Sequence, residues 1–119
     1  MNINKFTQKS LQAVQNCERI AMDYGNQEIA QEHLLYALLT QEDSLIAKLM
    51  EKMGLDKNLI INRVEEAIQK RPKVQGGQQY VGQDLNKALI HGEDEAKAMG
   101  DEYVSVEHLF LSIMKYAGK

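Results

Sequence analysis

The residues best suited to covalent chemistry are one cysteine, Cys17, and three histidines, His33, His91 and His108. A cysteine nucleophile needs a depressed pKa and a nearby base. Cys17 falls in the middle of a predicted helix, far from any helix N-terminus that would lower its pKa. We therefore expect Cys17 to be a packing residue, and we predict that the chain is not an enzyme by itself and has no catalytic residue.

The sequence also has no motif for binding a metal or a phosphate. The sequence lacks His-Glu-x-x-His, Glu-x-x-His and Cys-x-x-Cys. Adjacent Glu and His side chains point about 100° apart on a helix, so they do not converge on one ion. Gly76-Gly77 is not followed by the Gly-Lys-Ser/Thr of a phosphate-binding loop. We expect this domain to bind no metal and no cofactor. We expect His33 and His108 to have structural roles, by packing or hydrogen bonding, in the interface between the two repeats.

The tripeptide Glu-His-Leu occurs twice, at 32–34 and at 107–109. It belongs to a longer repeat, because residues 6–39 align without a gap to residues 81–114, with eight identical pairs in 34. The offset is 75 residues throughout. Such a repeat indicates two copies of one supersecondary unit, each needing the other to bury its apolar face. Catalysis rarely needs a site built twice, so the repeat favours a surface that presents similar features twice.

Apolar residues recur at helical spacing between the glycines and the single proline, and no segment alternates with the period of a strand. This pattern predicts an all-α fold. We expect helices at about 7–24, 31–40, 44–53 and 56–70 in the first copy, and at about 84–99 and 105–114 in the second.

Cap residues are expected at the helix ends, with Thr7 and Asp56 as N-caps and Gly25 and Gly100 as stops. The helical spacing also predicts which leucine and methionine side chains face the core. That group includes Leu45, Met53, Leu59 and Met99.

A stretch rich in Gly and Gln separates the two copies. We expect a single domain with repeat one at about 6–70, a linker loop at about 71–82, and repeat two at about 83–119. The two repeats should be related by a pseudo-twofold axis in a compact helical bundle. Only the first copy continues into two further helices, so we expect repeat two to be incomplete at its C-terminal end.

The charge balance limits the classes of partner. The formal net charge is −3, with 14 basic and 17 acidic residues, which argues against nucleic acid and against an anionic membrane surface as partners. No apolar run approaches the roughly 18 residues of a membrane span. A single cysteine cannot form an internal disulfide and fits a reducing compartment. We expect a soluble, cytoplasmic domain.

Five segments carry a resemblance to a known family, at residues 6–10, 26–29, 32–35, 70–74 and 101–109. The chain resembles the amino-terminal domain of ClpB-type chaperones, which are AAA+ disaggregases with a double Clp repeat. The first-repeat motifs are shared with ClpC- and ClpA-type unfoldases. The Arg-Pro-Lys-Val of the linker and the Asp-Glu-Tyr-Val-Ser-Val-Glu-His-Leu segment resemble ClpB more specifically.

The resemblance implies a domain that binds unfolded or aggregated polypeptides, or adaptor proteins, and delivers them to a AAA+ hexamer for threading. ATP and Mg would be bound by ATPase modules that this chain lacks, and the isolated domain is expected to be a monomer. Client contacts in ClpB-like domains match Thr7, Asp101 and Glu107 here. We expect a shallow apolar groove flanked by Asp101 and Glu107.

An alternative within the same family is a ClpC-type domain that binds adaptors and clients marked by phosphoarginine. In those domains the Glu of each Glu-His motif receives the modified arginine, which matches Glu32 and Glu107. A purely structural reading of these acids is also open, because an acid in the first helical turn complements the helix dipole by about 0.3–1 kcal/mol. A structural oligomerisation domain is a further alternative.

Overall fold

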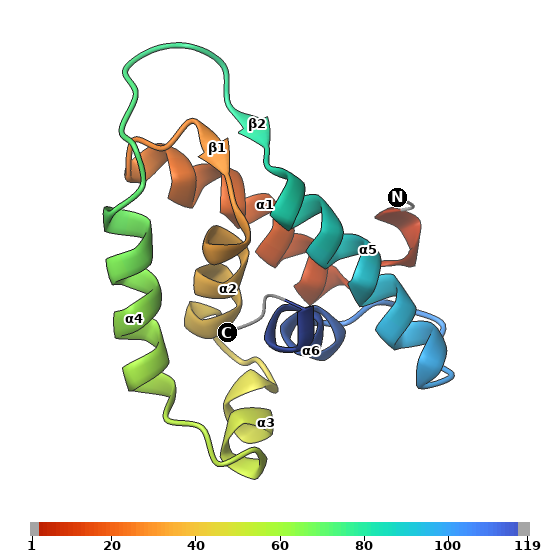
Figure 1. Cartoon of the computed structure of the whole chain (residues 1–119). Helices are drawn as coiled ribbons and strands as arrows, with labels where there is room; N and C mark the ends of the chain where they lie inside the picture. Colours follow the sequence, from red (N-terminus) through yellow and green to blue (C-terminus); the bar gives the residue numbers. More distant parts are fainter. Residues whose placement is uncertain (1–2, 117–119) are drawn as a thin grey trace.

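In the computed structural model, which describes residues 3–116, the chain is mainly helical (Figure 1), and this confirms the predicted all-α class. The two short strands pair in parallel. The elements, in order, are the 3-10 helix η1 (Ile3–Lys5), α1 (Gln8–Asp23), β1 (Glu28–Ile29), α2 (Gln31–Thr40), α3 (Ile46–Lys52), α4 (Lys57–Gln69), β2 (Tyr80–Val81), α5 (Gln83–Ala98) and α6 (Val106–Tyr116).

The expected caps set the helix ends. The Thr7 hydroxyl oxygen accepts a hydrogen bond from the backbone N–H of Ser10 at 3.2 Å, and so satisfies one of the unpaired donors at the start of α1. Asp56 caps α4 in the same way. Gly25, after α1, and Gly100, after α5, have φ of +74° and +72°, a left-handed conformation that glycine adopts without steric cost.

The two repeats are joined by reciprocal backbone pairing. Ile29 pairs with Val81 in the β1–β2 ladder, and Phe6 pairs with Val104 in an isolated parallel bridge. Phe6 and Val81 are 75 residues apart, as are Ile29 and Val104. The chain entering the first helix of each repeat therefore lies against the loop that precedes the second helix of the other repeat. This exchange supports the pseudo-twofold relation.

The ladder differs from one expectation. The 71–82 segment was expected to be a loop without regular structure, yet β2 lies within it. Two residues are too few to show strand periodicity in the sequence. Their extended conformation comes from pairing with β1, which is about 50 residues away along the chain.

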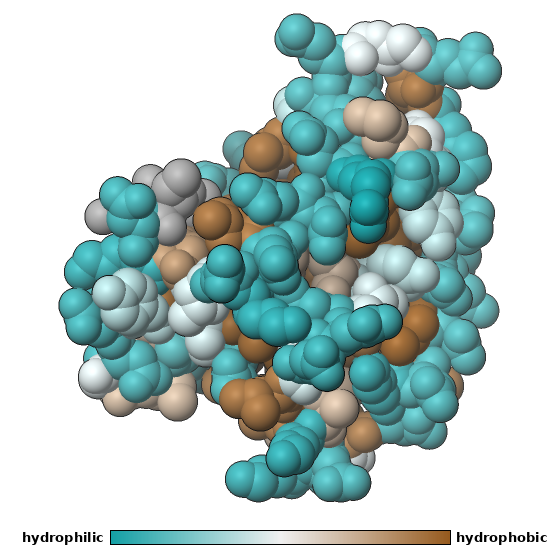
Figure 2. Space-filling model, turned by 180° about the vertical axis from the view of Figure 1, so that it is seen from behind, coloured by the Kyte–Doolittle hydropathy of each residue, from teal (hydrophilic) through white to brown (hydrophobic). Residues whose placement is uncertain are grey.

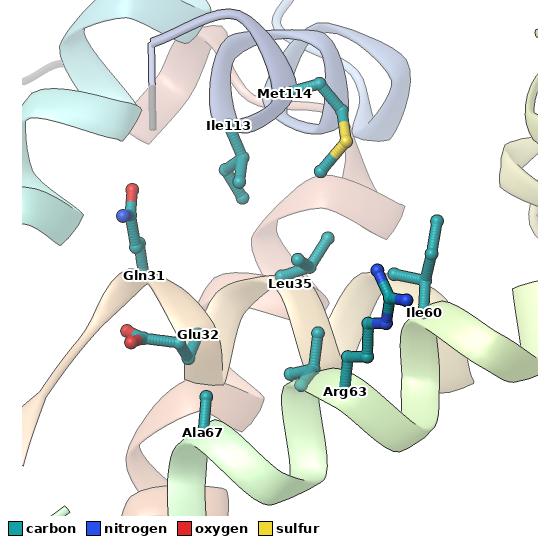
Figure 3. A pocket seen from close by; sticks show the side chains of 9 residues that line it. Gln31, Glu32, Leu35, Ile60, Arg63, Ala67, Ile113 and Met114 are labelled. Carbon is teal, nitrogen blue, oxygen red and sulfur yellow. The ribbon is translucent and has the colours of Figure 1, made fainter. Parts of the chain in front are cut away.

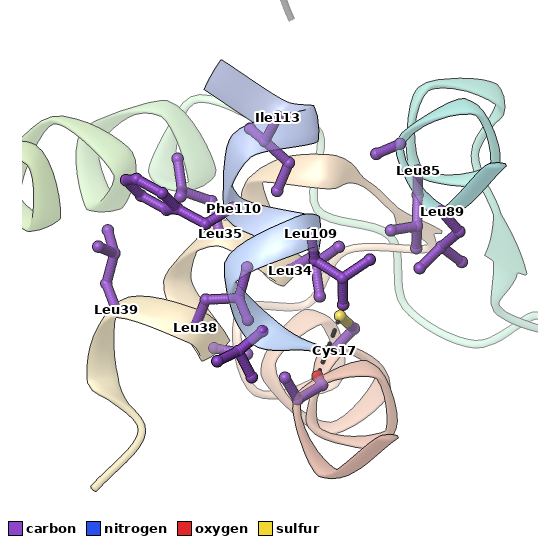
Figure 4. Close-up of a cluster of buried hydrophobic side chains, with 14 of the residues drawn as sticks. Cys17, Leu34, Leu35, Leu38, Leu39, Leu85, Leu89, Leu109, Phe110 and Ile113 are labelled. Atoms are coloured by element: carbon purple, nitrogen blue, oxygen red, sulfur yellow. Dashed lines mark hydrogen bonds between the residues drawn. The ribbon is translucent and has the colours of Figure 1, made fainter. Parts of the chain in front are cut away.

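The core lies where α1, α2, α5 and α6 meet (Figure 4). Leu34 and Leu109, the equivalent leucines of the two Glu-His-Leu motifs, are fully buried. The helices α5 and α6 pack closely at Gly92, where an added Cβ would lie 2.7 Å from Cδ2 of Leu109. The Ser112 hydroxyl donates to the Ala88 carbonyl at 2.7 Å across the same contact. The leucine-rich faces are thus buried between the repeats, as predicted.

Four side chains that were expected to face the core are exposed instead. The predicted stripe is correct within the helices, where Met50, Val64 and Ala88 are buried. It fails at helix ends, which extend past the neighbouring helix or turn away from it. The exposed fractions are 55% for Leu45, 43% for Met53, 47% for Leu59 and 56% for Met99.

The face opposite to that of Figure 1 is mainly hydrophilic, with apolar side chains in separate patches (Figure 2). No helix within residues 3–116 is both long enough and apolar enough to cross a membrane.

Candidate functional site

The two Glu-His-Leu motifs open α2 and α6 in the same way. The Nδ1 atom of His33 accepts the backbone N–H of Ala30 at 2.9 Å, and Nδ1 of His108 accepts the backbone N–H of Ser105 at 2.9 Å. Both rings are buried. Since Nδ1 is an acceptor, the proton of each neutral ring is on Nε2.

Each Nε2–H then donates to a side chain seven residues earlier. The acceptor is Oδ1 of Asn26 for His33, at 3.0 Å, and Oδ2 of Asp101 for His108, at 2.8 Å. Each histidine therefore ties the first turn of its helix to the loop before it. The expected structural role of both histidines is confirmed, although each acts within its own repeat. The fold thus explains why His and Leu recur in both copies.

The second copy has the residue types of a hydrolase triad. The Ser105 hydroxyl lies 3.1 Å from Nδ1 of His108, and Asp101 lies on the other ring nitrogen. A general base must accept the hydroxyl proton, but Nδ1 already accepts the Ser105 backbone N–H. In the first copy Ala30 and Asn26 make the equivalent bonds without a hydroxyl or a carboxylate. The arrangement is accordingly a helix cap.

Three of the predicted contact residues surround one loop. The backbone N–H of Thr7 donates to the carbonyl of Val104 at 3.0 Å, and the Ser10 hydroxyl donates to the same carbonyl at 2.7 Å. The start of α1 is thereby bound to the loop before α6, which Asp101 opens and Glu107 closely follows. The Thr7 hydroxyl itself is engaged in capping α1.

That loop presents acids beside an aromatic ring. The Asp101 side chain is 48% exposed despite its bond to His108, Glu102 is exposed, and Tyr103 is 50% exposed. Glu107 is partly exposed and has no hydrogen-bond or ion-pair partner within residues 3–116. We name residues 101–107, which are the loop and the first two residues of α6, the acidic loop. Its carboxylates suit a cationic side chain, and Tyr103 offers an apolar contact.

Glu32 lies in a different environment from its repeat partner, Glu107. Its Oε1 forms an ion pair with the Arg71 guanidinium at 3.2 Å, and Arg71 also pairs with Glu28 at 3.3 Å. The Nε atom of Arg71 is buried without an acceptor among the described residues. The charge of Glu32 is therefore compensated inside the domain. Sequence reasoning missed this pairing, because Arg71 lies outside the aligned segments of the repeat and is 39 residues from Glu32.

An apolar groove of about 430 Å³ runs between α2, α4 and α6 (Figure 3). It lies at the C-terminal end of α6, whereas Asp101 and Glu107 lie at the N-terminal side of that helix. This groove is not the one expected between Asp101 and Glu107, and the charged residues that line it are Glu32 and Arg63. The lining residues are Gln31, Glu32, Leu35, Ile60, Arg63, Val64, Ala67, Ile113 and Met114.

Cys17 has the character of a packing residue. Burial raises the pKa of its thiol to about 12, and the thiol donates to the Ala13 carbonyl at 3.4 Å. A thiol with this pKa is protonated at neutral pH and is a poor nucleophile. Among residues 3–116, no three His, Cys, Asp or Glu side chains gather as a metal site would require.

Comparison with known proteins identifies the class. The chain is an all-α module of two repeats. The repeats are joined by backbone pairing, and a histidine caps the second helix of each. Residues 5–118 match the family model of the Clp repeat (R) N-terminal domain, and the chain belongs to this family.

The relatives include ClpB chaperones. The chain is 42% identical over 114 residues to the chaperone protein ClpB of Porphyromonas gingivalis, and 40% identical over 120 residues to that of Nitratidesulfovibrio vulgaris. These matches cover 96% and 97% of the chain but only 13% and 14% of the two relatives. Among solved structures, a ClpV N-domain in complex with a VipB peptide has a TM-score of 0.77 at 19% identity. That match covers 97% of this chain and 71% of the other.

Proposed function

We propose that the domain is the substrate-recognition module of an ATP-dependent Clp chaperone. It binds unfolded or aggregated polypeptides, or adaptor proteins, and delivers them to a AAA+ hexamer for threading. ATP and Mg belong to the ATPase modules of that machine, and this domain works in the cytoplasm without a cofactor of its own. The ClpB relatives and the peptide complex of a structurally similar ClpV N-domain support this proposal.

The acidic loop is the observation that carries the proposal. It combines the carboxylates of Asp101, Glu102 and Glu107 with the exposed ring of Tyr103. Its backbone is held by hydrogen bonds with Thr7, Ser10 and Nδ1 of His108, so little ordering is needed when a ligand arrives.

Such a surface favours clients with exposed apolar and basic residues. Burial of apolar surface contributes about 25 cal/mol per Å², and the ordering of a flexible chain opposes it. The resulting affinity is weak and tolerant of sequence, as suits a module that meets many clients. The acids add selectivity, because a basic client side chain gains from them and an acidic one is repelled.

The phosphoarginine-binding alternative would use Glu32 together with Glu107. The ion pairs of Arg71 with Glu28 and Glu32 count against the first of these sites, because an incoming guanidinium must displace an internal one. We therefore assign polypeptide binding to the acidic loop, and binding of free phosphoarginine to the domain would favour the alternative.

The test uses Asp101→Asn with Glu107→Gln. The asparagine keeps an oxygen acceptor for His108, as Asn26 does for His33, so the charges are removed without loss of the cap. The probe is a fluorescein-labelled unstructured peptide rich in Leu, Phe and Lys. Each exposed charge pair contributes about 0.2–1 kcal/mol, so we expect the double variant to bind roughly 2- to 30-fold more weakly at low salt.

The matched control is Asp94→Asn with Glu66→Gln, which removes the same charges at exposed positions of α5 and α4. This control should bind like the unmodified chain. A peptide with Glu in place of Lys should bind weakly to all three proteins. Equal affinity of the control and the acidic-loop variant for the basic peptide would contradict the proposal.

A further inference from the structure

A buried hydroxyl on α1 contacts the acidic loop directly. The Ser10 side chain is completely buried, and its hydroxyl donates to the carbonyl of Val104 at 2.7 Å. The other acceptor within its reach, the Thr7 carbonyl, is farther away at 3.0 Å and already accepts the backbone N–H of Leu11. The Ser10 oxygen in turn accepts the Thr7 hydroxyl at 3.0 Å. The two hydroxyls thus form a short chain of hydrogen bonds that ends in the middle of the acidic loop.

The equivalent place in the other half of the molecule has no such hydroxyl. At the 75-residue offset, Ser10 corresponds to Leu85, which is also buried. The backbone bond at this place is the same in both halves. The N–H of Gly82 donates to the carbonyl of Ile29 at 2.9 Å, which matches the bond that the Thr7 N–H makes to the acidic loop. The local fold therefore forms with a leucine at this position.

Packing alone would favour the leucine. A buried hydroxyl costs free energy unless it is hydrogen-bonded, whereas a leucine side chain gains from burial. The two halves differ in the loop that this residue faces. The acidic loop carries Asp101, Tyr103 and Glu107, and its counterpart before α2 does not. The hydroxyl of Ser10 is therefore best explained by the loop that it holds.

We propose that Ser10 is a positioning residue for client binding. It touches no client itself, because it is completely buried. Its hydroxyl fixes the Val104 carbonyl relative to α1, so that the acids on either side of Val104 and the start of α1 present one ordered surface. This inference rests on the proposed function of the acidic loop and names a residue that sets the geometry of that loop.

The test uses Ser10→Ala, which removes only the hydroxyl. The Val104 carbonyl keeps its bond from the Thr7 N–H, so it is not left without a partner. The matched control is Ser112→Ala. The Ser112 hydroxyl is equally buried and donates to the Ala88 carbonyl at the same distance of 2.7 Å, but it joins α5 to α6 outside the acidic loop.

The probe is the fluorescein-labelled basic peptide of the preceding experiment. We expect Ser10→Ala to raise its Kd about 2- to 10-fold, because a loosened loop must be ordered on binding. Ser112→Ala should bind like the unmodified chain. Ser10→Cys keeps a weak donor and should recover part of the affinity. Hydrogen exchange of the backbone amides at 101–107 should be faster in Ser10→Ala and unchanged in Ser112→Ala.

A double-mutant cycle separates positioning from general destabilisation. When Ser10→Ala is added to the acidic-loop double variant, it should change Kd by less than about twofold, because the charges that it positions are gone. A loss of stability alone would weaken binding by the same factor in both backgrounds, and that result would contradict the inference. Circular dichroism establishes that each variant is folded.

Two further results would overturn the inference while leaving the proposed function intact. The first is equal affinity of Ser10→Ala and the unmodified chain when the acidic-loop double variant binds more weakly. The second is an equal loss of affinity in Ser10→Ala and Ser112→Ala. If the acidic-loop double variant itself binds like the unmodified chain, the proposed function fails and this inference fails with it.

Discussion

His108 donates from Nε2 to the carboxylate of Asp101 at 2.8 Å, and this bond closes the loop that carries the proposed client contacts. The Asp101 side chain is also half-exposed. It therefore both stabilises the loop through His108 and contributes a negative charge to the surface. Removal of the whole side chain would change both. Removal of its charge alone would test the surface role without loss of the hydrogen bond. Repeat one has this arrangement, because Asn26, a neutral residue, accepts the equivalent bond from His33.

The first prediction concerns stability at this bond. Asp101→Ala leaves the buried Nε2–H of His108 without its partner, and we expect the free energy of unfolding to fall by about 1–2 kcal/mol. Asp101→Asn should lie within about 0.5 kcal/mol of the unmodified chain, because an oxygen acceptor remains. Urea unfolding followed by circular dichroism measures both. Equal loss in the two variants would show that the charge, and not the hydrogen bond, holds the loop.

The second prediction concerns pH. Burial, followed by the nearby Arg71 guanidinium, lowers the pKa of His33 from its ordinary value of 6.5. The unfolded chain then binds a proton at higher pH than the folded chain. The free energy of unfolding therefore falls as the pH drops below about 6.5, until the folded chain is protonated as well.

An NMR titration of the ring protons measures the pKa of His33 directly. The 15N shifts at neutral pH should also report Nε2–H tautomers for both His33 and His108, as their hydrogen bonds require. A pKa of His33 above 6.5 would contradict the assigned environment.

The third prediction concerns an ion pair of repeat two that repeat one lacks. Glu95 is buried and forms an ion pair with Lys115 at 3.0 Å, whereas the equivalent positions of repeat one hold Ile20 and Thr40. The hydrogen bond from Lys115 to Glu95 raises the pKa of that lysine. Lys115→Met leaves a buried carboxylate unpaired and should lower the melting temperature.

The double variant Glu95→Ile with Lys115→Thr replaces the ion pair by the residues of repeat one. It should melt at or above the temperature of the unmodified chain, since Glu95, the buried member of the pair, is replaced by an apolar side chain and its carboxylate no longer has to be desolvated. A double variant less stable than Lys115→Met would show that repeat two is not packed like repeat one at this point.

The fourth prediction concerns Cys17. Because burial raises the pKa of its thiol to about 12, a thiol reagent at pH 8 should not react with the folded domain except through opening of the core. The rate of modification should therefore rise with urea in parallel with the unfolded fraction. Rapid, complete modification without denaturant would contradict the buried position.

The limits of sequence reasoning are visible in particular residues. Thr7 and Asp56 were predictable as caps, because the hydroxyl and carboxylate bond to amides only three residues away. Leu45 and Leu59 were wrongly placed in the core, because helical spacing gives the direction of a side chain but not the length of the neighbour that covers it. Likewise, the sequence did not predict that Glu32 pairs with Arg71 and His108 with Asp101, because these pairs form only where loops come together in the folded chain.

The sequence alone determined the duplicated helical unit, its caps and the family, because these depend on local periodicity and on residues at a fixed offset. Only the tertiary structure decided that each repeat pairs its backbone with the other. It also decided that Arg71 neutralises Glu32 while the Glu107 side chain has no partner within residues 3–116, and that the groove lies at the far end of α6 from the acidic loop. These features join segments tens of residues apart. They form only when whole helices pack against one another, and local sequence patterns do not predict that packing.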